Sequence, residues 1–353
     1  MDRINLVRAL VREHGADGVL LTFLPDVRWA CGFTGSNGIL LVTQSSAHFF
    51  SDGRYLLQAA REVSGAEIHI TSDNLFEHLA SSRLLSNEHI LFQSDHILHS
   101  TFVQLTSLIP GVIWHPSPDL LTRKVAVKDK DEIGRITEAL RITESVFEKI
   151  LGFIQPGVTE KEIAAEIVYE HLKLGAEKMS FDPVVASGLN GALPHARPSD
   201  KKIVPGDLIV LDIGCFLDGY ASDMTRTVCV GQPSPEARAV YEVVLKAQNE
   251  AIRQARAGMR AKDLDFAARS VIQEAGYGDH FNHSLGHGVG LQIHEWPRIS
   301  KDAEFEIPAG AVVTIEPGVY IPDSFGVRIK DMVVITEDGC ENLSRAVKNL
   351  ICL

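Results

Sequence analysis

The spacing of apolar and polar residues predicts short helices and strands in alternation over the first third of the chain. Apolar residues recur at helical spacing near the N-terminus and over residues 55–63 and 74–85, which predicts amphipathic helices. Short apolar runs bounded by turn residues predict strands at residues 18–23, 38–43, 47–51, 67–70, 89–92 and 112–114. This alternation indicates an α/β domain that ends near residue 122.

The remaining residues show a longer pattern that occurs twice. Amphipathic helices are predicted in two pairs, at residues 131–154 and 159–174 and again at 235–257 and 261–275. Strand pairs follow, within residues 207–230 and between 311–315 and 327–335. The repeat predicts a pseudo-symmetric α+β domain whose helices enclose its sheet, with a site where the halves meet. The predicted organisation is residues 1–122, a linker at 123–130 that is rich in charge after two prolines, and a second domain at 131–353.

Composition and charge narrow the class of protein. The net charge of -12 argues against a nucleic-acid or anionic-membrane binder, since both need a basic surface. No apolar run approaches 18 residues, and the charged N-terminus does not resemble a signal peptide. The cysteines are scattered without a CxxC motif, which predicts reduced thiols and a cytoplasmic protein. They are Cys31, Cys215, Cys229, Cys340 and Cys352.

A predicted hairpin over residues 207–230 places two acidic side chains on one face. The Asp218-Gly219 pair is typical of a two-residue type I′ turn, which opposes Asp212 to Thr225 and makes Asp212 and Asp223 diagonal neighbours. Asp212 lies in an apolar run, where an unpaired carboxylate is very costly to bury. We therefore expect the two carboxylates to converge on a cation. The alternative is one turn cap and one solvated edge residue.

The segment from 283 to 297 supplies further candidate ligands. His283, His287 and His294 lie among glycines that disfavour a helix, and no HExxH motif is present, so an extended segment is expected. Glu316 ends the predicted strand 311–315, just before Pro317-Gly318, where a site can open. Taken singly, each of these residues is better explained as a core, surface or turn residue than as a ligand. Together with the two aspartates, they form a carboxylate-rich set suited to one or two divalent ions such as Mn²⁺.

The motifs LDIGCFLDGYASDMTRT, HSLGHGVGLQIHEWP, TIEPGVYIP and GVRIKD resemble, in order and spacing, those of the pita-bread proline-specific metallopeptidases, aminopeptidase P and prolidase. GFTGSNGILLVT and FFSDGRYLLQA resemble the creatinase-like N-terminal domain of that family, so the resemblance covers nearly the whole chain. It implies a pita-bread catalytic domain, proline-containing dipeptide or peptide substrates, a divalent metal (Mn, Co or Zn) and a homodimer. Methionine aminopeptidase shares the catalytic fold but lacks the N-terminal domain, which makes it the weaker match.

The resemblance also implies roles for individual residues. It makes four residues metal ligands: Asp212, Asp223, His287 and Glu316. It places His195 near the scissile bond and gives His283 and His294 hydrogen bonds to the substrate and the tetrahedral intermediate. It gives Arg328 an orienting role. These roles agree with acid–base and electrostatic catalysis, in which Glu316 shuttles a proton.

One position departs from the family pattern. The fifth ligand of the family is the glutamate of an RIED motif, which bridges both metals, whereas this chain has Lys330 there. An ammonium cannot replace a bridging carboxylate and repels a nearby divalent ion. Strand parity points Lys330 to the same face as Arg328.

Two hypotheses follow from Lys330. The first is an Xaa-Pro dipeptidase or aminopeptidase P with a weakened second metal site. The alternative is a metal-free creatinase-like hydrolase, or an inactive pita-bread protein that only binds. We rank the peptidase first because the other motif positions are retained. The sequence does not distinguish a dipeptidase from an aminopeptidase that acts on longer peptides.

Overall fold

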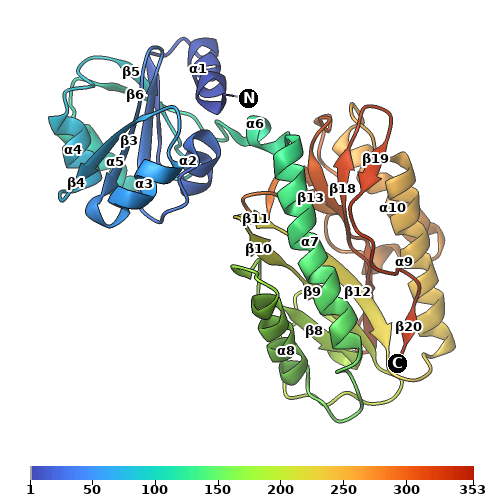
Figure 1. Cartoon of the computed structure of the whole chain (residues 1–353). Helices are drawn as coiled ribbons and strands as arrows, with labels where there is room; N and C mark the ends of the chain where they lie inside the picture. The colour runs from blue at the N-terminus through green and yellow to red at the C-terminus, as the bar shows by residue number, and fades with distance from the viewer. Residues whose placement is uncertain (1) are drawn as a thin grey trace. The chain divides into compact units, whose positions relative to one another are not determined.

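The computed structural model describes residues 2–353, and the chain divides into two compact units, Met1–Val125 and Ala126–Leu353 (Figure 1). The boundary falls inside the segment predicted as a linker, at helix α6 (Thr122–Ala126). No helix in the described part of the chain is long and apolar enough to cross a membrane.

The first unit is built on one six-stranded mixed sheet of order β4-β3-β2-β1-β5-β6. Its strands are β1 (Gly18–Leu21), β2 (Ile39–Thr43), β3 (Ala47–Asp52), β4 (Glu67–Thr71), β5 (His89–Phe92) and β6 (Ile113–Pro116). Strands β1, β2 and β3 pair antiparallel, whereas β4, β5 and β6 join the sheet in parallel. The predicted strands and the predicted hairpin between β2 and β3 are confirmed.

Helices and a 3-10 turn pack around this sheet. The spacing of apolar residues predicted some of these helices but not all. The helices are α1 (Arg3–Glu13), α2 (Leu24–Cys31), α3 (Leu56–Glu62), α4 (Leu75–Ser81) and α5 (His99–Leu108), with η1 (Gly53–Tyr55) before α3. Helices α2 and α5 were not predicted, because α2 is short and α5 buries a single apolar residue, Leu105. The core packs Leu20, Leu41 and Phe50 of the sheet against Leu79 and Leu105.

The second unit contains four sheets. A four-stranded sheet has the order β20-β12-β9-β8 and a five-stranded sheet the order β14-β13-β15-β18-β19; smaller sheets join β11-β10-β7 and β16-β17. The strands in chain order are β7 (Lys178–Met179), β8 (Val184–Ser187), β9 (Leu208–Ile213), β10 (Cys215–Leu217), β11 (Tyr220–Ala221), β12 (Met224–Cys229), β13 (Gly286–Gly288), β14 (Glu295–Ile299), β15 (Val312–Ile315), β16 (Gly318–Ile321), β17 (Phe325–Arg328), β18 (Asp331–Ile335), β19 (Cys340–Asn342) and β20 (Ile351–Cys352).

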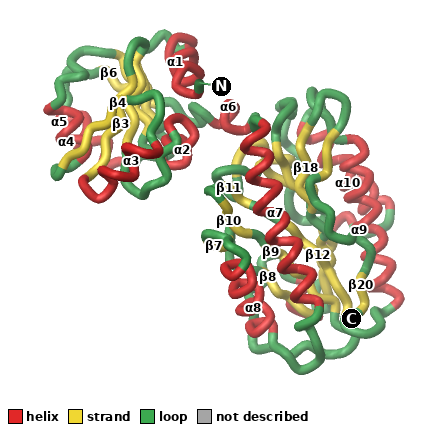
Figure 2. The backbone as a smooth tube through the Cα atoms, viewed as in Figure 1, coloured by secondary structure: helices red, strands yellow, loops and turns green. Residues whose placement is uncertain are grey.

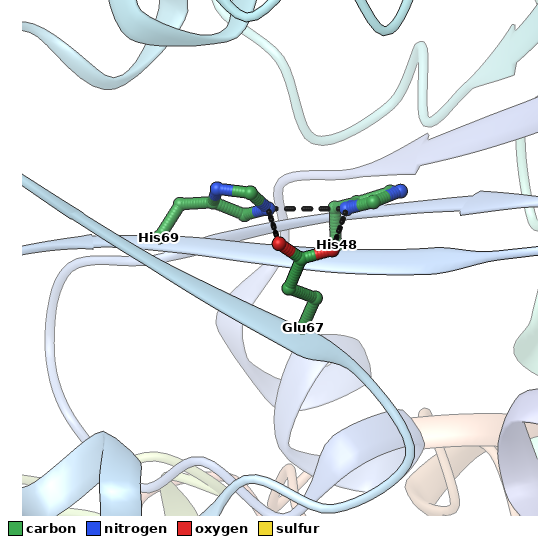
Figure 3. A group of neighbouring side chains, drawn as sticks. All are labelled: His48, Glu67 and His69. Atoms are coloured by element: carbon green, nitrogen blue, oxygen red, sulfur yellow. Dashed lines mark hydrogen bonds and ion pairs between the residues drawn. The ribbon is translucent and has the colours of Figure 1, made fainter.

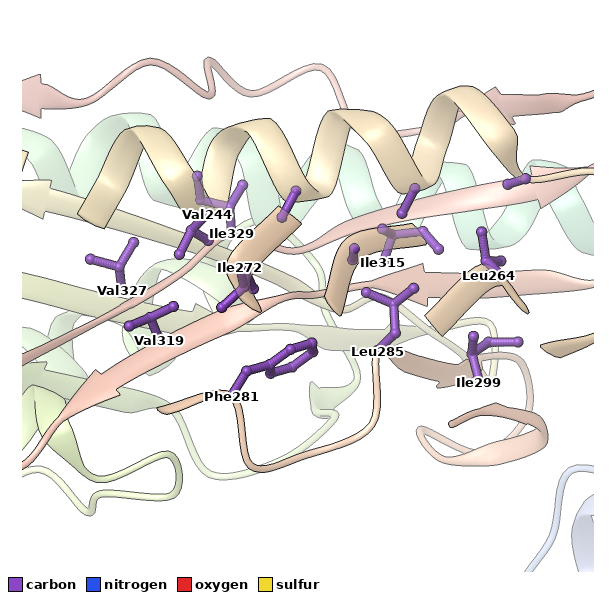
Figure 4. Packing of buried hydrophobic residues seen from close by; sticks show 14 of the residues in the cluster. Val244, Leu264, Ile272, Phe281, Leu285, Ile299, Ile315, Val319, Val327 and Ile329 are labelled. Atoms are coloured by element: carbon purple, nitrogen blue, oxygen red, sulfur yellow. The ribbon is translucent and has the colours of Figure 1, made fainter. Parts of the chain in front are cut away.

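Helix pairs α7 with α8 and α9 with α10 lie outside these strands, as Figure 2 shows. They are α7 (Lys130–Leu151), α8 (Glu160–Lys173), α9 (Pro235–Gln254) and α10 (Ala261–Glu274), with short 3-10 turns η2 (Gly188–Ala192) and η3 (Gly278–His280). The predicted capping box of Thr159 and Glu162 starts α8. In Figure 4, Val244 of α9 and Leu264 of α10 belong to the same buried cluster as Ile315 and Val327 of the strands. The predicted order of helix, helix and sheet, given twice, is confirmed.

The predicted strand 327–335 is wrong as one element. Strand β17 ends at Arg328 and pairs with β16, and β18 begins at Asp331 and pairs with β15. Between them the backbone turns to β12: the Arg328 amide donates to Thr227 Oγ1, and the Lys330 amide donates to the carbonyl of Thr225. This contact joins the two larger sheets at Lys330.

Candidate active site

The hairpin of β9 to β12 brings Asp212 and Asp223 to one place, as its turn predicted. Both turn residues have positive φ, 46° at Asp218 and 73° at Gly219, as a type I′ turn requires. Asp212 pairs with Thr225 in the predicted register, and both aspartates are buried.

Asp212 is held by two donors. Thr225 Oγ1 donates to Asp212 Oδ1 at 2.6 Å, and Arg328 Nη2 donates to Asp212 Oδ2 at 2.7 Å. Arg328 comes from the last position of β17 and is itself buried. Asp212 Oδ2 is therefore already in an ion pair with the Arg328 guanidinium.

The ammonium of Lys330 lies among all three acidic side chains. Its Nζ is 2.6 Å from Asp223 Oδ1, 3.1 Å from Asp212 Oδ1 and 3.4 Å from Glu316 Oε2. Its side chain is 5% exposed, and the ring of Phe181 lies 5.5 Å from the nitrogen. The side chain points as strand parity predicted, and it lies in the space toward which the three carboxylates converge.

His287 binds the other oxygens of two of these carboxylates. Its Nε2 is 3.3 Å from Asp223 Oδ2 and 3.2 Å from Glu316 Oε1. Asp223 and Glu316 thus each turn one oxygen to Lys330 and the other to His287. Asp223 Oδ2 is buried without a hydrogen bond among the described residues, and the ion pair with His287 is its one described interaction.

Close strand packing positions His287. A Cβ at Gly286 would collide with the carbonyl of Thr314 on β15, and one at Gly288 with the carbonyl of Trp296 on β14. The absence of a side chain at both glycines therefore lets the neighbouring strands approach closely. Thr314 Oγ1 accepts from the His287 amide and donates to Glu316 Oε1, which ties both residues to one strand.

The mutual charges determine the ionisation of this cluster. Burial acts to raise the pKa of Asp212, but Lys330 and Arg328 outweigh it and hold that pKa below its ordinary value. Burial likewise acts to raise the pKa of Glu316, and Lys330 and His287 hold it well below its usual range. Burial lowers the pKa of the Lys330 ammonium, yet the three carboxylates raise it overall. For His287, burial is outweighed by Asp223 and Glu316, which raise its pKa to about 10.

The cluster is therefore neutral without a metal ion. Three carboxylates, Asp212, Asp223 and Glu316, face three cations: the Arg328 guanidinium, the Lys330 ammonium and the protonated His287. A divalent ion does not fit between Asp212 and Asp223, because the ammonium is already within contact distance of both. On the other side, Asp223 Oδ2, Glu316 Oε1 and His287 Nε2 form a two-carboxylate, one-imidazole donor set once His287 loses its proton. Two carboxylates and one imidazole are ligands that divalent transition metals accept, and they leave a coordination position open for water or substrate.

The remaining predicted residues lie at different distances from this cluster. His283 Nε2 is 3.0 Å from the hydroxyl of Tyr320, which accepts from Arg328 Nη1 at 2.7 Å. Burial lowers the pKa of His283. The exposed His294 ring packs edge-on against His287, with centroids 4.4 Å apart. Burial and the neighbouring His287 lower the pKa of His294.

His195 is not brought into the cluster. It is exposed, and no described contact joins it to the other site residues. Its neighbour Pro194 is tied to the site, because the Pro194 carbonyl accepts from Arg328 Nη1 at 3.0 Å.

Two residues near the site were missed by the sequence analysis. Tyr320 links His283 to Arg328. It lies two positions from Gly318, the register partner of Arg328, so a predicted β16–β17 hairpin would have placed Tyr320 and Arg328 on one face. Glu160, fully buried at the start of α8, accepts six hydrogen bonds from Ser187, Asn190 and Ser199. It holds both ends of the loop that carries His195. Because Glu160 directly follows the capping residue Thr159, it resembled an ordinary first-turn glutamate.

The family model for metallopeptidase family M24 matches residues 134–337, and the model for the creatinase/prolidase N-terminal domain matches residues 3–123. This chain belongs to metallopeptidase family M24. The pita-bread fold and the creatinase-type N-terminal domain predicted from the motifs are thereby confirmed.

Full-length relatives of this M24 protein carry related names. It is 35% identical to the Xaa-Pro dipeptidase of Pyrococcus horikoshii over 351 residues, which cover 99% of each chain. The structure of an Xaa-Pro dipeptidase from Bacillus anthracis superposes with a TM-score of 0.96 at 37% identity, over 100% of this chain and 99% of that one. An X-Pro aminopeptidase from Thermotoga maritima superposes with a TM-score of 0.92 at 36% identity, over 98% of this chain and 100% of that one.

Proposed function

We propose that this M24 protein hydrolyses Xaa-Pro peptide bonds with the help of one divalent metal ion. Family membership and full-length relatives named as Xaa-Pro dipeptidase or X-Pro aminopeptidase support the reaction. The observation that carries the proposal is Asp223 Oδ2, a buried carboxylate oxygen without a hydrogen bond that lies 3.3 Å from His287 Nε2. The same nitrogen lies 3.2 Å from Glu316 Oε1, so His287 stands between two carboxylates. A scaffold that only binds would have no need of such a set.

Lys330 takes the place of a second ion in this proposal. Its ammonium contacts both oxygens of Asp212 and one oxygen each of Asp223 and Glu316, so its charge lies on the side of the cluster that faces Asp212. In this proposal the Asp212 carboxylate pairs with Lys330 and Arg328 and is not a metal ligand. When bound at the His287 side, a divalent ion supplies a Lewis acid for the substrate carbonyl and makes water more acidic.

The chain's own residues supply proton transfer and hydrogen bonds. Glu316 has one oxygen on the His287 side and is the candidate base that takes a proton from the attacking water. His283 and His294 are candidate donors to the developing negative charge. Arg328 orients Tyr320 and Asp212 at once. His195 is proposed to meet the substrate near the scissile bond, on the loop that Glu160 holds.

The first test combines turnover with metal analysis. Metal-free protein is reconstituted with Mn²⁺, Co²⁺ or Zn²⁺ and assayed on Xaa-Pro dipeptides and on longer peptides with proline in the second position. Proline release from dipeptides alone indicates a dipeptidase, and release of the N-terminal residue from longer peptides indicates an aminopeptidase. No turnover of either class with any of the three metals would contradict the proposal.

Metal counting tests the ligand assignment separately. We expect His287→Ala to bind one equivalent less than the wild type, and Lys330→Glu to bind one equivalent more, because a carboxylate then replaces the ammonium. Equal binding by wild type and His287→Ala would refute the ligand set. Turnover in protein shown by this count to lack metal at the site would favour the metal-free alternative instead.

We also propose a cytoplasmic homodimer. The scattered cysteines, three of them buried, suit a reducing compartment, and the dimer is carried over from the family resemblance. Light scattering of the purified protein measures the oligomeric state.

A further inference from the structure

Two histidines and one glutamate meet on the sheet of the first unit, and none of them belongs to the candidate active site (Figure 3). His48 lies on β3, and Glu67 and His69 lie two positions apart on the edge strand β4. His48 is the register partner of Glu67, so all three side chains project from the same face of the sheet.

The three side chains place their ligand atoms at the spacing of a coordination shell. His48 Nδ1 is 3.0 Å from His69 Nε2 and 3.4 Å from Glu67 Oε2, and His69 Nε2 is 3.9 Å from Glu67 Oε1. Ligands bound tetrahedrally at about 2.0–2.1 Å lie roughly 3.3–3.4 Å from one another. The two distances to Glu67 are to different oxygens, and with one ligand atom taken from each residue all three lie within 4.8 Å of one another. Side-chain rotation would therefore seat an ion without moving the strands.

The orientation of His48 is fixed by a second layer of contacts. Its Nε2 is 2.9 Å from Ser46 Oγ, which is 2.9 Å from Thr43 Oγ1. With the Nε2 proton donated to Ser46, the lone pair of Nδ1 points at His69 and Glu67. The His69 ring stacks on Phe50, with centroids 4.6 Å apart and planes 16° apart. These contacts pre-orient both imidazoles.

We propose that His48, Glu67 and His69 form a second metal site, for a zinc-type divalent transition metal. Two imidazoles and one carboxylate form a donor set that such ions favour, and they leave a fourth position for water. That position faces outward, because the Glu67 side chain is 68% exposed while that of His48 is 9% exposed. An ion there ties the edge strand β4 to β3. The site is independent of the proposed peptidase reaction.

Zn²⁺ binding by the full-length chain tests this site. Metal-free wild type, Glu67→Gln and His69→Gln are dialysed against Zn²⁺, and bound metal is counted. We expect each variant to bind one equivalent less than the wild type, whereas the loss in His287→Ala is separate and additive. Glu67→Gln changes an exposed side chain, so it keeps the test valid if His69→Gln does not fold.

A second histidine pair provides the matched control. His89 Nδ1 lies 2.8 Å from His115 Nε2 on the parallel strands β5 and β6, with no ion pair to a carboxylate among the described residues. We expect His115→Gln to bind as much Zn²⁺ as the wild type.

Hydrogen exchange locates the bound ion. Zn²⁺ should slow exchange over residues 46–71 in the wild type and in His287→Ala but not in Glu67→Gln. Equal metal counts in wild type, Glu67→Gln and His69→Gln would overturn the site, as would unchanged exchange over residues 46–71.

Discussion

Replacing Lys330 by methionine tests whether the ammonium compensates the acidic cluster. Methionine keeps an unbranched apolar stem but carries no charge. In the wild type, three carboxylates face three cations; in Lys330→Met, Asp223 loses its closest partner, which lies 2.6 Å away, and the buried cluster gains an uncompensated negative charge. Metal-free Lys330→Met should therefore be less stable than metal-free wild type.

The expected loss follows from the burial of both partners. The side chains of Lys330 and Asp223 are 5% and 1% exposed, so solvent screens their attraction little. Removing one partner of a buried pair costs about 3–5 kcal/mol. For a unit of this size, each kcal/mol lowers the melting temperature by roughly 2–4 °C. We expect the second unit of Lys330→Met to melt roughly 6–20 °C lower.

Calorimetry of metal-free protein measures this shift. Lys348→Met is the matched control: Lys348 is 24% exposed, and its partner Asp331 keeps the buried Arg226. The control should lose about 1 kcal/mol or less. Divalent metal should recover stability in Lys330→Met more than in the wild type, because the ammonium no longer competes. A Lys330→Met protein as stable as the wild type without metal would refute the balance of three carboxylates against three cations.

Three further outcomes are expected. Glu160→Ala should speed hydrogen exchange over residues 187–199, because the loop loses its hydrogen bonds to Glu160. The misplaced loop should lower kcat/KM for Xaa-Pro dipeptides about 10- to 100-fold. The control Glu162→Ala should affect only the α8 cap. Asp331→Asn should cost about 3–5 kcal/mol in chemical denaturation, because Arg226 loses a buried partner, without changing the metal count. In metal-free protein the raised pKa of His287 adds stability that is complete below about pH 6.5 and is lost as pH rises toward 10. Unfolding curves over pH 6–10 should show this loss in the wild type and not in His287→Gln.

The sequence predicted the parts of the site that depend on local rules. The Asp218-Gly219 turn determines the register of the hairpin, and the register determines that Asp212 and Asp223 share a face. Strand parity also predicted Lys330 beside Arg328, and both contact Asp212, although the predicted strand breaks between the two residues. Each of these inferences needs only neighbouring residues and a period of two.

Partner choice across the fold was not predictable. Nothing near Asp223 or Glu316 in the chain indicates that each divides its two oxygens between Lys330 and His287. The hydrogen bonds of Glu160 reach residues up to 39 positions away in the sequence. The His48–Glu67–His69 group depends on the parallel pairing of β3 with β4, which the apolar pattern does not specify.

A cationic side chain is covalently attached and cannot diffuse away from its site as a metal ion can. Because Lys330 and Arg328 together neutralise Asp212 and Asp223, the two larger sheets join at this point without a bound metal ion. We therefore expect newly made chains to fold their second unit even when metal is scarce. We expect metal starvation of the cell to abolish the peptidase activity while the amount of the protein stays unchanged.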